Sequence, residues 1–160
     1  MKRSLLSACL LFMFALIARA QEEPLTLKKG IILDSLQVRD TIPETFALYI
    51  PTAFKNNEAW PIIFVMDMEG RGKKAISKFR SAAEKHRYLL AASNNLNDSL
   101  SISQNILTSA RLMKTMAAMF TIGKGRIYMA GFGNGGRMAG ITPFFISGIA
   151  GVISIGAPVN

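Results

Sequence analysis

Short apolar runs alternate along the chain with longer segments in which apolar residues recur at helical spacing. A run of consecutive apolar residues is typical of a strand that is buried on both faces of a parallel sheet. Four such runs span residues 61–66, 88–92, 126–130 and 151–155. Two earlier segments, 25–38 and 45–50, are rich in alternating or β-favouring apolar residues and are separated by Pro43. They predict two antiparallel strands at one edge of the sheet.

Apolar residues spaced three and four apart predict helices between these strands. The pattern covers residues 73–86 and 102–120, and each segment has one apolar face. A shorter helix is predicted to begin near Gly135 and to stop or kink before Pro143. Strands that alternate with helices imply a parallel sheet built from right-handed crossovers. The predicted fold class is α/β, with a mostly parallel sheet flanked by helices and an antiparallel N-terminal edge.

The first 20 residues have the three-part layout of a secretory signal peptide. A basic start at residues 1–3 is followed by the largely apolar run 5–17 and by small residues before Gln21. We expect cleavage after Ala20 and export to the periplasm or the extracellular space. Retention as an N-terminal anchor is one alternative. A lipoprotein signal at Cys9 is another, although most of the apolar run follows this cysteine instead of preceding it.

Composition narrows the chemistry of the predicted mature domain, residues 21–160. The whole chain has a net charge of +9, and three of its cations lie in the predicted signal peptide, which leaves +6. No alternation of aromatic and basic residues marks a nucleic-acid surface, so we predict no nucleic-acid partner. One cysteine and one histidine exclude an internal disulfide and a Cys/His zinc cluster. We expect no metal, no cofactor and no stable membrane span after signal cleavage.

A glycine-rich turn between the strand at 126–130 and the following helix is the most informative motif. Gly131, Gly133 and Gly136 match the dinucleotide fingerprint G-x-G-x-x-G, which binds pyrophosphate on backbone N–H groups at a helix start. That fingerprint needs an acidic residue about 20 positions later to bind the ribose, and no Asp or Glu follows Asp98. The turn also comes after several strands, whereas the fingerprint normally opens its βαβ unit.

The same turn also matches the nucleophile elbow G-x-S-x-G, in which a serine stands on a strained strand-to-helix turn. The matching residues are Gly131, Phe132, Gly133, Asn134 and Gly135, so glycine occupies the position of the serine. Glycine adopts a positive φ without steric cost, and the turn can therefore survive without its nucleophile. A purely structural turn is the third interpretation.

Four segments around this turn carry a resemblance to a known family. They are Glu44–Pro51 (ETFALYIP), Trp60–Asp67 (WPIIFVMD), Ser93–Asn95 (SNN) and Ala130–Arg137 (AGFGNGGR). Together they resemble α/β-hydrolases, in particular secreted bacterial esterases of the polyhydroxyalkanoate-depolymerase and feruloyl-esterase type. The resemblance covers residues from about 30 to 160 and corresponds to the N-terminal half of such enzymes.

The resemblance implies which residues would form the site. In that family the loop after the third strand supplies an N–H group to the oxyanion hole, and the matching loop here is Asp67–Gly72. The candidate oxyanion-loop or ligand-binding residues are Asp67, Met68, Glu69, Gly70 and Asn134. We expect Gly70 and Gly72 to let backbone N–H groups point inward.

The resemblance also implies that this chain lacks the catalytic residues of the family. The family serine aligns with Gly133, and the triad acid and histidine, which follow the serine in chain order, have no counterparts. We therefore expect no catalytic residue in this chain. If the protein is active, ester hydrolysis is the expected reaction.

Three functions and one structural interpretation stay open. The chain is an exported ester-hydrolase-type domain, a non-catalytic pseudoenzyme module with a pocket at 67–72, 93–101 and 131–136, or a dinucleotide-binding domain. The expected ligand of such a pocket is a small ester, acyl or sugar compound. The chain is also interpreted as a truncated half of a hydrolase, whose open sheet edge after 151–155 favours self-association.

Other polar residues have simpler interpretations. His86 ends the helix predicted over 73–86, where a positive charge suits the helix dipole. Asp67 and Glu69 could pair for acid–base chemistry or hold a cation, but we interpret them as part of a pocket mouth. Four serines are interpreted as loop and helix-capping residues of one polar segment: Ser93, Ser99, Ser101 and Ser103.

Overall fold

The computed structural model describes residues 27–157. The predicted signal peptide, its cleavage after Ala20 and the alternative lipoprotein signal at Cys9 lie outside the described residues. Between residues 27 and 157, no helix combines the length and the apolar character that a membrane crossing requires.

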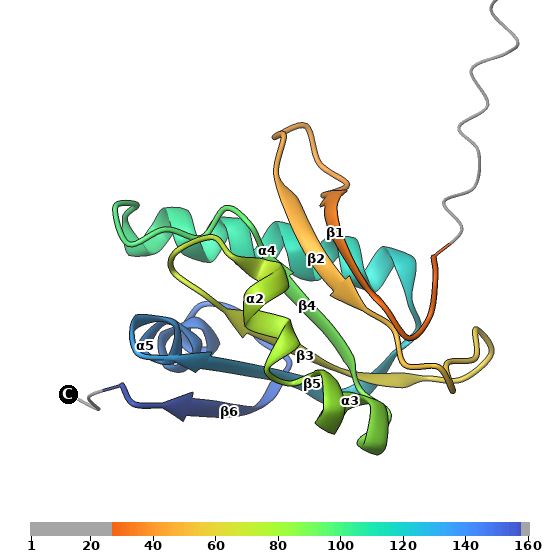
Figure 1. Ribbon diagram of the computed structural model, residues 1–160. Helices are drawn as coiled ribbons and strands as arrows, with labels where there is room; N and C mark the ends of the chain where they lie inside the picture. The colour runs from red at the N-terminus through yellow and green to blue at the C-terminus, as the bar shows by residue number, and fades with distance from the viewer. Residues whose placement is uncertain (1–26, 158–160) are drawn as a thin grey trace, which may run out of the picture.

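Six strands form one sheet, in the order β1-β2-β4-β3-β5-β6 (Figure 1). Strand β1 pairs antiparallel with β2, and β2 pairs antiparallel with β4, whereas β3, β4, β5 and β6 run parallel to one another. This arrangement confirms the predicted mostly parallel sheet with an antiparallel N-terminal edge. The strand bounds are Ile32–Gln37 (β1), Thr45–Tyr49 (β2), Trp60–Met66 (β3), Leu89–Ser93 (β4), Ile122–Phe132 (β5) and Ile149–Ile155 (β6).

Two details of the strand predictions were wrong. The first strand begins at Ile32 and not at residue 25, and Gly30 lies just before it with a φ of +75°. Ser93 is the last residue of β4 and is buried, so it does not belong to the polar loop that follows. Its hydroxyl accepts a hydrogen bond from the Asn95 N–H at 3.0 Å, which lets a polar residue end a buried strand.

Within residues 27–157, four α-helices connect the strands: α2 (Gly72–Ser77), α3 (Arg80–His86), α4 (Ile102–Met119) and α5 (Asn134–Ile141). Helix α5 ends before Pro143, as predicted, and the proline lies in a short 3₁₀ turn, Thr142–Phe144. The single helix predicted over 73–86 is in fact two helices. The chain tightens between them because the N–H groups of Lys78 and Phe79 donate to carbonyls three residues earlier.

The helices cover both faces of the sheet (Figure 1). Buried residues of α4 and α5, among them Met116 and Met138, pack in one apolar cluster with residues of β2 to β5. Ala75, Ile76 and Ala83 of α2 and α3 pack in a second cluster with residues of β2, β3 and β4. The parallel strands are therefore buried between two helical layers, and their carboxyl ends open toward the glycine-rich turn.

Helix α4 starts with a capping box. The Ser101 hydroxyl accepts a hydrogen bond from the Gln104 N–H at 3.2 Å, and the Gln104 side chain accepts one from the Ser101 N–H at 3.0 Å. This confirms the capping interpretation for Ser101. We expect Ser101→Ala to lower the free energy of unfolding by about 1 kcal/mol, because the N–H groups of the first turn lose an acceptor. Urea denaturation measures the change.

The control for this prediction is Ser103→Ala in the same helical turn. Ser103 is exposed, and its side chain makes no hydrogen bond with any of residues 27–157. We expect this substitution to leave stability unchanged or slightly increased, because alanine is the better helix former. Equal losses in the two variants would contradict a capping role for Ser101.

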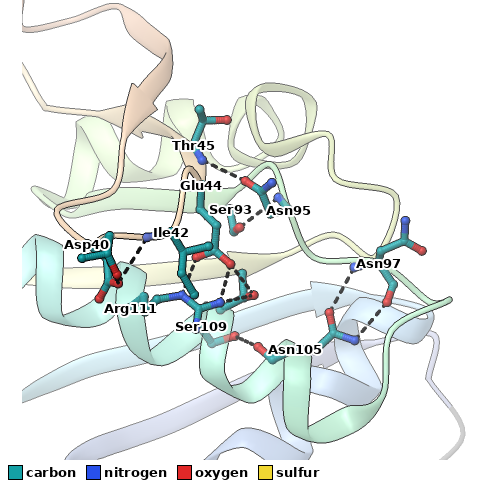
Figure 2. Close-up of polar contacts among 12 residues, drawn as sticks. Asp40, Ile42, Glu44, Thr45, Ser93, Asn95, Asn97, Asn105, Ser109 and Arg111 are labelled. Atoms are coloured by element: carbon teal, nitrogen blue, oxygen red, sulfur yellow. Dashed lines mark hydrogen bonds and ion pairs between the residues drawn. The ribbon is translucent and has the colours of Figure 1, made fainter.

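A buried ion pair joins Glu44, the residue just before strand β2, to Arg111 of helix α4 (Figure 2). Glu44 is 6% exposed and accepts a hydrogen bond at 2.8 Å from the Arg111 Nε, a second from the Arg111 Nη2, and a third at 2.8 Å from the Thr108 hydroxyl. The Arg111 hydrogen bond lowers the pKa of Glu44 against the opposing effect of burial. Every Glu44 oxygen has a donor, so the charge is tolerated in the core.

Strand β6 is the last strand of the sheet. It pairs with β5 on one side, and none of residues 27–157 pairs with its other side. Val152, Ile153 and Ile155 are each about two-fifths exposed, and the nearby Phe144 and Phe145 are 87% and 66% exposed. Self-association through this edge stays a prediction that rests on the same apolar surface.

Candidate functional site

The glycine-rich turn joins the end of β5 to the start of α5, and Gly133 is its central residue. Gly133 has φ = +54° and ψ = −124°, a combination that is strained for any residue with a side chain. Its N–H donates to the Ile155 carbonyl at 2.8 Å, and its carbonyl accepts from the Arg137 N–H at 3.0 Å. These two bonds hold the turn against β6 and start the helix.

The two glycines on either side of Gly133 are required by close packing. A Cβ atom on Gly131 would lie 2.3 Å from the Gly135 backbone, and one on Gly135 would lie 2.2 Å from the Met66 carbonyl oxygen. A Cβ atom on Gly133 would meet no atom within 4 Å. The turn therefore has the packing of a nucleophile elbow, with free space where the nucleophile would project.

A cavity of about 320 Å³ lies beside this turn at the carboxyl ends of β3 and β5. It is lined by the end of β3 and the loop after it, by one side of α2, by Asp98 and by the turn itself. Among the predicted candidates it brings together Asp67, Met68, Glu69 and Asn134, but not Gly70. Its size is at the lower end of the range for small-molecule sites.

The loop after β3 does not use its glycines as predicted. The Gly70 N–H donates to the Asp67 carbonyl at 3.1 Å, and the Gly72 N–H donates to the Asn94 Oδ1 at 3.1 Å. Neither N–H therefore points inward as a free donor. The glycines are required because a Cβ atom on Gly70 or Gly72 would lie 2.6 Å from an oxygen of Asn94. They let the loop pass closely against the end of β4.

Two other backbone donors belong to the cavity lining. The N–H groups of Met68 and Asn134 make no hydrogen bond with any of residues 27–157. Asn134 directly follows the elbow position, and Met68 lies on the loop after β3. These are the two places from which the oxyanion hole of an elbow-type hydrolase takes its N–H groups. Both N–H groups therefore remain available as donors at the cavity lining.

The acidic residues of the cavity are held by neighbouring side chains. Arg71 forms ion pairs with Asp67, at 3.2 Å, and with Glu69. The hydrogen bond that Arg71 donates to Asp67 raises the pKa of Arg71, which keeps the guanidinium charged. Asp98 accepts a hydrogen bond at 3.0 Å from the Asn134 side chain. The structure thus places Asp67 and Glu69 at the cavity and pairs both with a cation.

Most of the polar segment at 93–101 has a structural role. Asn97 and Asn105 form two mutual hydrogen bonds, of 3.0 and 2.9 Å, and the Thr45 N–H donates to Asn95 at 2.8 Å (Figure 2). Of this segment, Asp98 alone lines the cavity beside the glycine-rich turn. The Asp98 N–H donates to the Met68 carbonyl at 3.2 Å, which ties the segment to the loop after β3.

Five cavity residues lie outside the segments that the sequence analysis assigned to the pocket: Val65, Met66, Lys74, Ala75 and Lys78. Lys74 lies in α2, and Lys78 is the C-cap residue directly after that helix, four positions later and still in helical backbone conformation. The Lys78 Nζ lies 4.3 Å from the centre of the Phe132 ring, and the Phe79 ring packs against Phe132 at 5.8 Å. The i, i+4 spacing of the lysines was visible in the sequence, but nothing there placed them beside the turn.

His86 cannot serve as the base of an elbow nucleophile in this structure. It lines a separate hollow of about 170 Å³ with Trp60, the first residue of β3, whereas the elbow lies beside Met66 at the other end of that strand. Seven residues of strand at about 3.3 Å each place these ends roughly 20 Å apart. The position of His86 at the end of α3 agrees with its structural interpretation.

The glycine spacing of the dinucleotide fingerprint has a packing explanation. Gly131 and Gly136 lie against each other, since a Cβ atom on Gly136 would be 2.9 Å from the Gly131 carbonyl oxygen. The same atom would be 2.9 Å from the Ser154 hydroxyl of β6. Close packing of the helix on β5 and β6 therefore accounts for these glycines without a nucleotide.

The fold of this chain is similar to the folds of several solved structures. No protein-family model matches the chain, and no curated protein matches its sequence. A hyperthermophilic esterase from the archaeon Pyrobaculum calidifontis superposes with a TM-score of 0.61 at 16% identity, over 83% of this chain and 47% of that one. An α/β-hydrolase enzyme from the metagenome of Lake Arreo gives 0.60 at 15% identity, over 84% and 46%.

A third structure extends the comparison to a fungal protein. The acetyl xylan esterase from Aspergillus awamori superposes with a TM-score of 0.58 at 11% identity, over 78% of this chain and 53% of that one. This chain therefore spans about half the length of the solved esterases it matches. At such low identities the likeness concerns the fold.

Proposed function

We propose that this chain, whose fold is that of the α/β-hydrolases, is an exported esterase-like module that binds a small ester or acyl ligand without hydrolysing it through a serine triad. One observation carries the proposal. Gly133 has the strained backbone and the open surroundings of a nucleophile position, but it has no side chain. Export rests on the signal-peptide pattern of the first 20 residues.

The cavity has groups that can bind an ester or acyl ligand, but the serine nucleophile and histidine base of a triad are not placed together in it. The Met68 and Asn134 N–H groups can donate hydrogen bonds to a ligand oxygen, and Phe132 supplies an apolar wall. A triad needs a nucleophile and a base within hydrogen-bond reach of each other. Here the nucleophile position is Gly133, and His86, the only histidine, lies near the opposite end of β3.

The experiment compares ester hydrolysis by three forms of the purified chain. We expect p-nitrophenyl butyrate to be hydrolysed by the unchanged chain no faster than by a heat-denatured sample. Gly133→Ser restores a hydroxyl that has room in the cavity, but we expect no turnover because the histidine, His86, lines a separate hollow near the other end of β3. Gly133→Ala is the matched control, since it introduces the same backbone strain without a hydroxyl.

Both Gly133 variants are expected to fold with a reduced stability. The free energy of unfolding should fall by about 1–3 kcal/mol in each, because φ = +54° is unfavourable for a side-chain-bearing residue. Urea denaturation and ester hydrolysis are measured on the same samples. Turnover by the unchanged chain above the denatured sample would contradict the proposal. Turnover by Gly133→Ser above Gly133→Ala would show that a base is present after all.

A further inference from the structure

The cavity beside the elbow has a polar end and an apolar wall, and this division bears on what it binds. The polar end holds the Met68 and Asn134 N–H groups. The apolar wall is formed by Val65, Ala75 and the partly exposed ring of Phe132. A ligand that fills such a site has a polar head and a short apolar chain.

The charged residues of the cavity lining indicate whether the polar head of the ligand is positive or negative. The cavity has three cations and three carboxylates, so its total charge favours neither sign. The arrangement is uneven, however. Arg71 is engaged by Asp67 and Glu69, whereas Lys74 and Lys78 form no ion pair with any of residues 27–157. Lys74 of α2 and Lys78, the residue directly after that helix, line the same cavity, and Lys78 is directly beside Phe132.

The glycine at position 133 leaves the space that a serine side chain would otherwise occupy. No atom lies within 4 Å of a Cβ built on Gly133, and the adjacent Asn134 N–H has no acceptor among residues 27–157. A two-oxygen head therefore has room that a nucleophile would have filled. Two backbone N–H donors and two lysine ammonium groups are suited to a carboxylate, because each stabilises negative charge on oxygen.

We propose that the elbow cavity is a binding site for a short-chain acyl carboxylate, with the anion toward Lys74, Lys78 and the free N–H groups and the acyl chain against Phe132. The inference rests on the proposed function, because it names the ligand of the same cavity. It differs from that proposal in the chemical class, which is the free acid anion and not its ester. The ligand is released or taken up without a covalent step.

The test is a titration of the full chain, enriched in ¹⁵N, with butyrate at constant ionic strength. Saturable shifts are expected at the amide signals of Met68 and Asn134. Butyramide and methyl butyrate have a similar size and no charge, and we expect them to bind at least tenfold more weakly. Acetate is expected to bind more weakly than butyrate, because it lacks the methylene groups that contact Phe132.

Lysine variants test the charge directly. Lys74→Met and Lys78→Met are each expected to weaken butyrate binding about three- to fivefold, as partly exposed charge pairs do. Lys78→Arg should bind butyrate as tightly as the unchanged chain does, because arginine keeps the positive charge. Lys85→Met is the control, since Lys85 is an exposed lysine of α3 outside the cavity lining. Urea denaturation confirms that the variants are folded.

The outcomes separate this inference from the proposed function. Equal binding of butyrate and methyl butyrate, or unchanged binding in both methionine variants, would overturn the carboxylate and leave the acyl site in place. Binding of none of these compounds would overturn both proposals. Hydrolysis of p-nitrophenyl butyrate together with lysine-dependent butyrate binding would overturn only the non-catalytic part of the proposed function.

Discussion

Gly135→Ala is expected to lower the free energy of unfolding by at least about 3 kcal/mol, a large fraction of the 5–15 kcal/mol typical of a domain. The added Cβ atom would lie 2.2 Å from the Met66 carbonyl oxygen and 2.9 Å from the Met66 carbonyl carbon. Both atoms belong to the backbone of a central strand, so no side-chain rotation relieves the clash. Helix α5 would have to move away from β3, and the elbow would move with it.

Gly140→Ala is the matched control in the same helix. A Cβ atom on Gly140 would meet no atom within 4 Å, and its backbone lies within α5. We expect this variant to gain about 0.5–1 kcal/mol, because alanine is the better helix former. Urea denaturation followed by circular dichroism measures both variants. A loss below 1 kcal/mol for Gly135→Ala would contradict the tight packing of the elbow.

The second large effect is expected at the buried ion pair between Glu44 and Arg111 of α4. Arg111→Met should lower the free energy of unfolding at pH 7 by about 2–4 kcal/mol, because it leaves the Glu44 carboxylate buried with the Thr108 hydroxyl as its remaining side-chain donor. Glu44→Gln should cost less, since Arg111 is the more exposed partner and its charge can reach water. Urea denaturation at pH 7 measures both.

The stability lost in Arg111→Met is expected to depend on pH, and the pKa of Glu44 gives the direction of this dependence. The pKa of Glu44 lies below its ordinary value of 4.5, chiefly because of the Arg111 hydrogen bond. A carboxylate with a lowered pKa contributes stability above its unfolded-state pKa and loses it as the pH falls through the folded-state pKa. The stability difference between the unchanged chain and Arg111→Met should therefore be full at pH 7 and shrink below about pH 4.5.

An exposed ion pair serves as the control for this effect. Lys55 and Glu58 lie 3.1 Å apart at the surface, and we expect Lys55→Met to change stability little at any pH. A difference between the unchanged chain and Arg111→Met that stays constant from pH 7 to pH 3.5 would show that lost packing, and not the buried charge, causes the effect.

The fold class followed from local patterns because buried parallel strands and amphipathic helices have different apolar periods. The order of the elements was predicted, and so was the turn at 131–135. The break of the 73–86 segment into two helices was not, because both halves keep the same apolar face and the tightening at Lys78 and Phe79 leaves that pattern intact.

The candidate site was predicted in outline and corrected in its parts. The elbow and the loop after β3 do meet, since parallel strands bring their carboxyl ends to one edge of the sheet. The free donors are Met68 and Asn134, while Gly70 and Gly72 serve close packing. Which N–H is free depends on carbonyl and side-chain oxygens of distant segments, such as Asn94, and no local pattern contains those.

By itself, the sequence determined the α/β class, the glycine at position 133 of the strand-to-helix turn and the absence of a second histidine, since these depend only on residue identity and periodicity. Only the tertiary structure decided that Gly133 faces open space, that His86 is remote from it and that Lys74 and Lys78 line the same cavity as Phe132. These are distances between segments far apart in the chain. They are set by how the helices pack on the sheet, which local propensity does not encode.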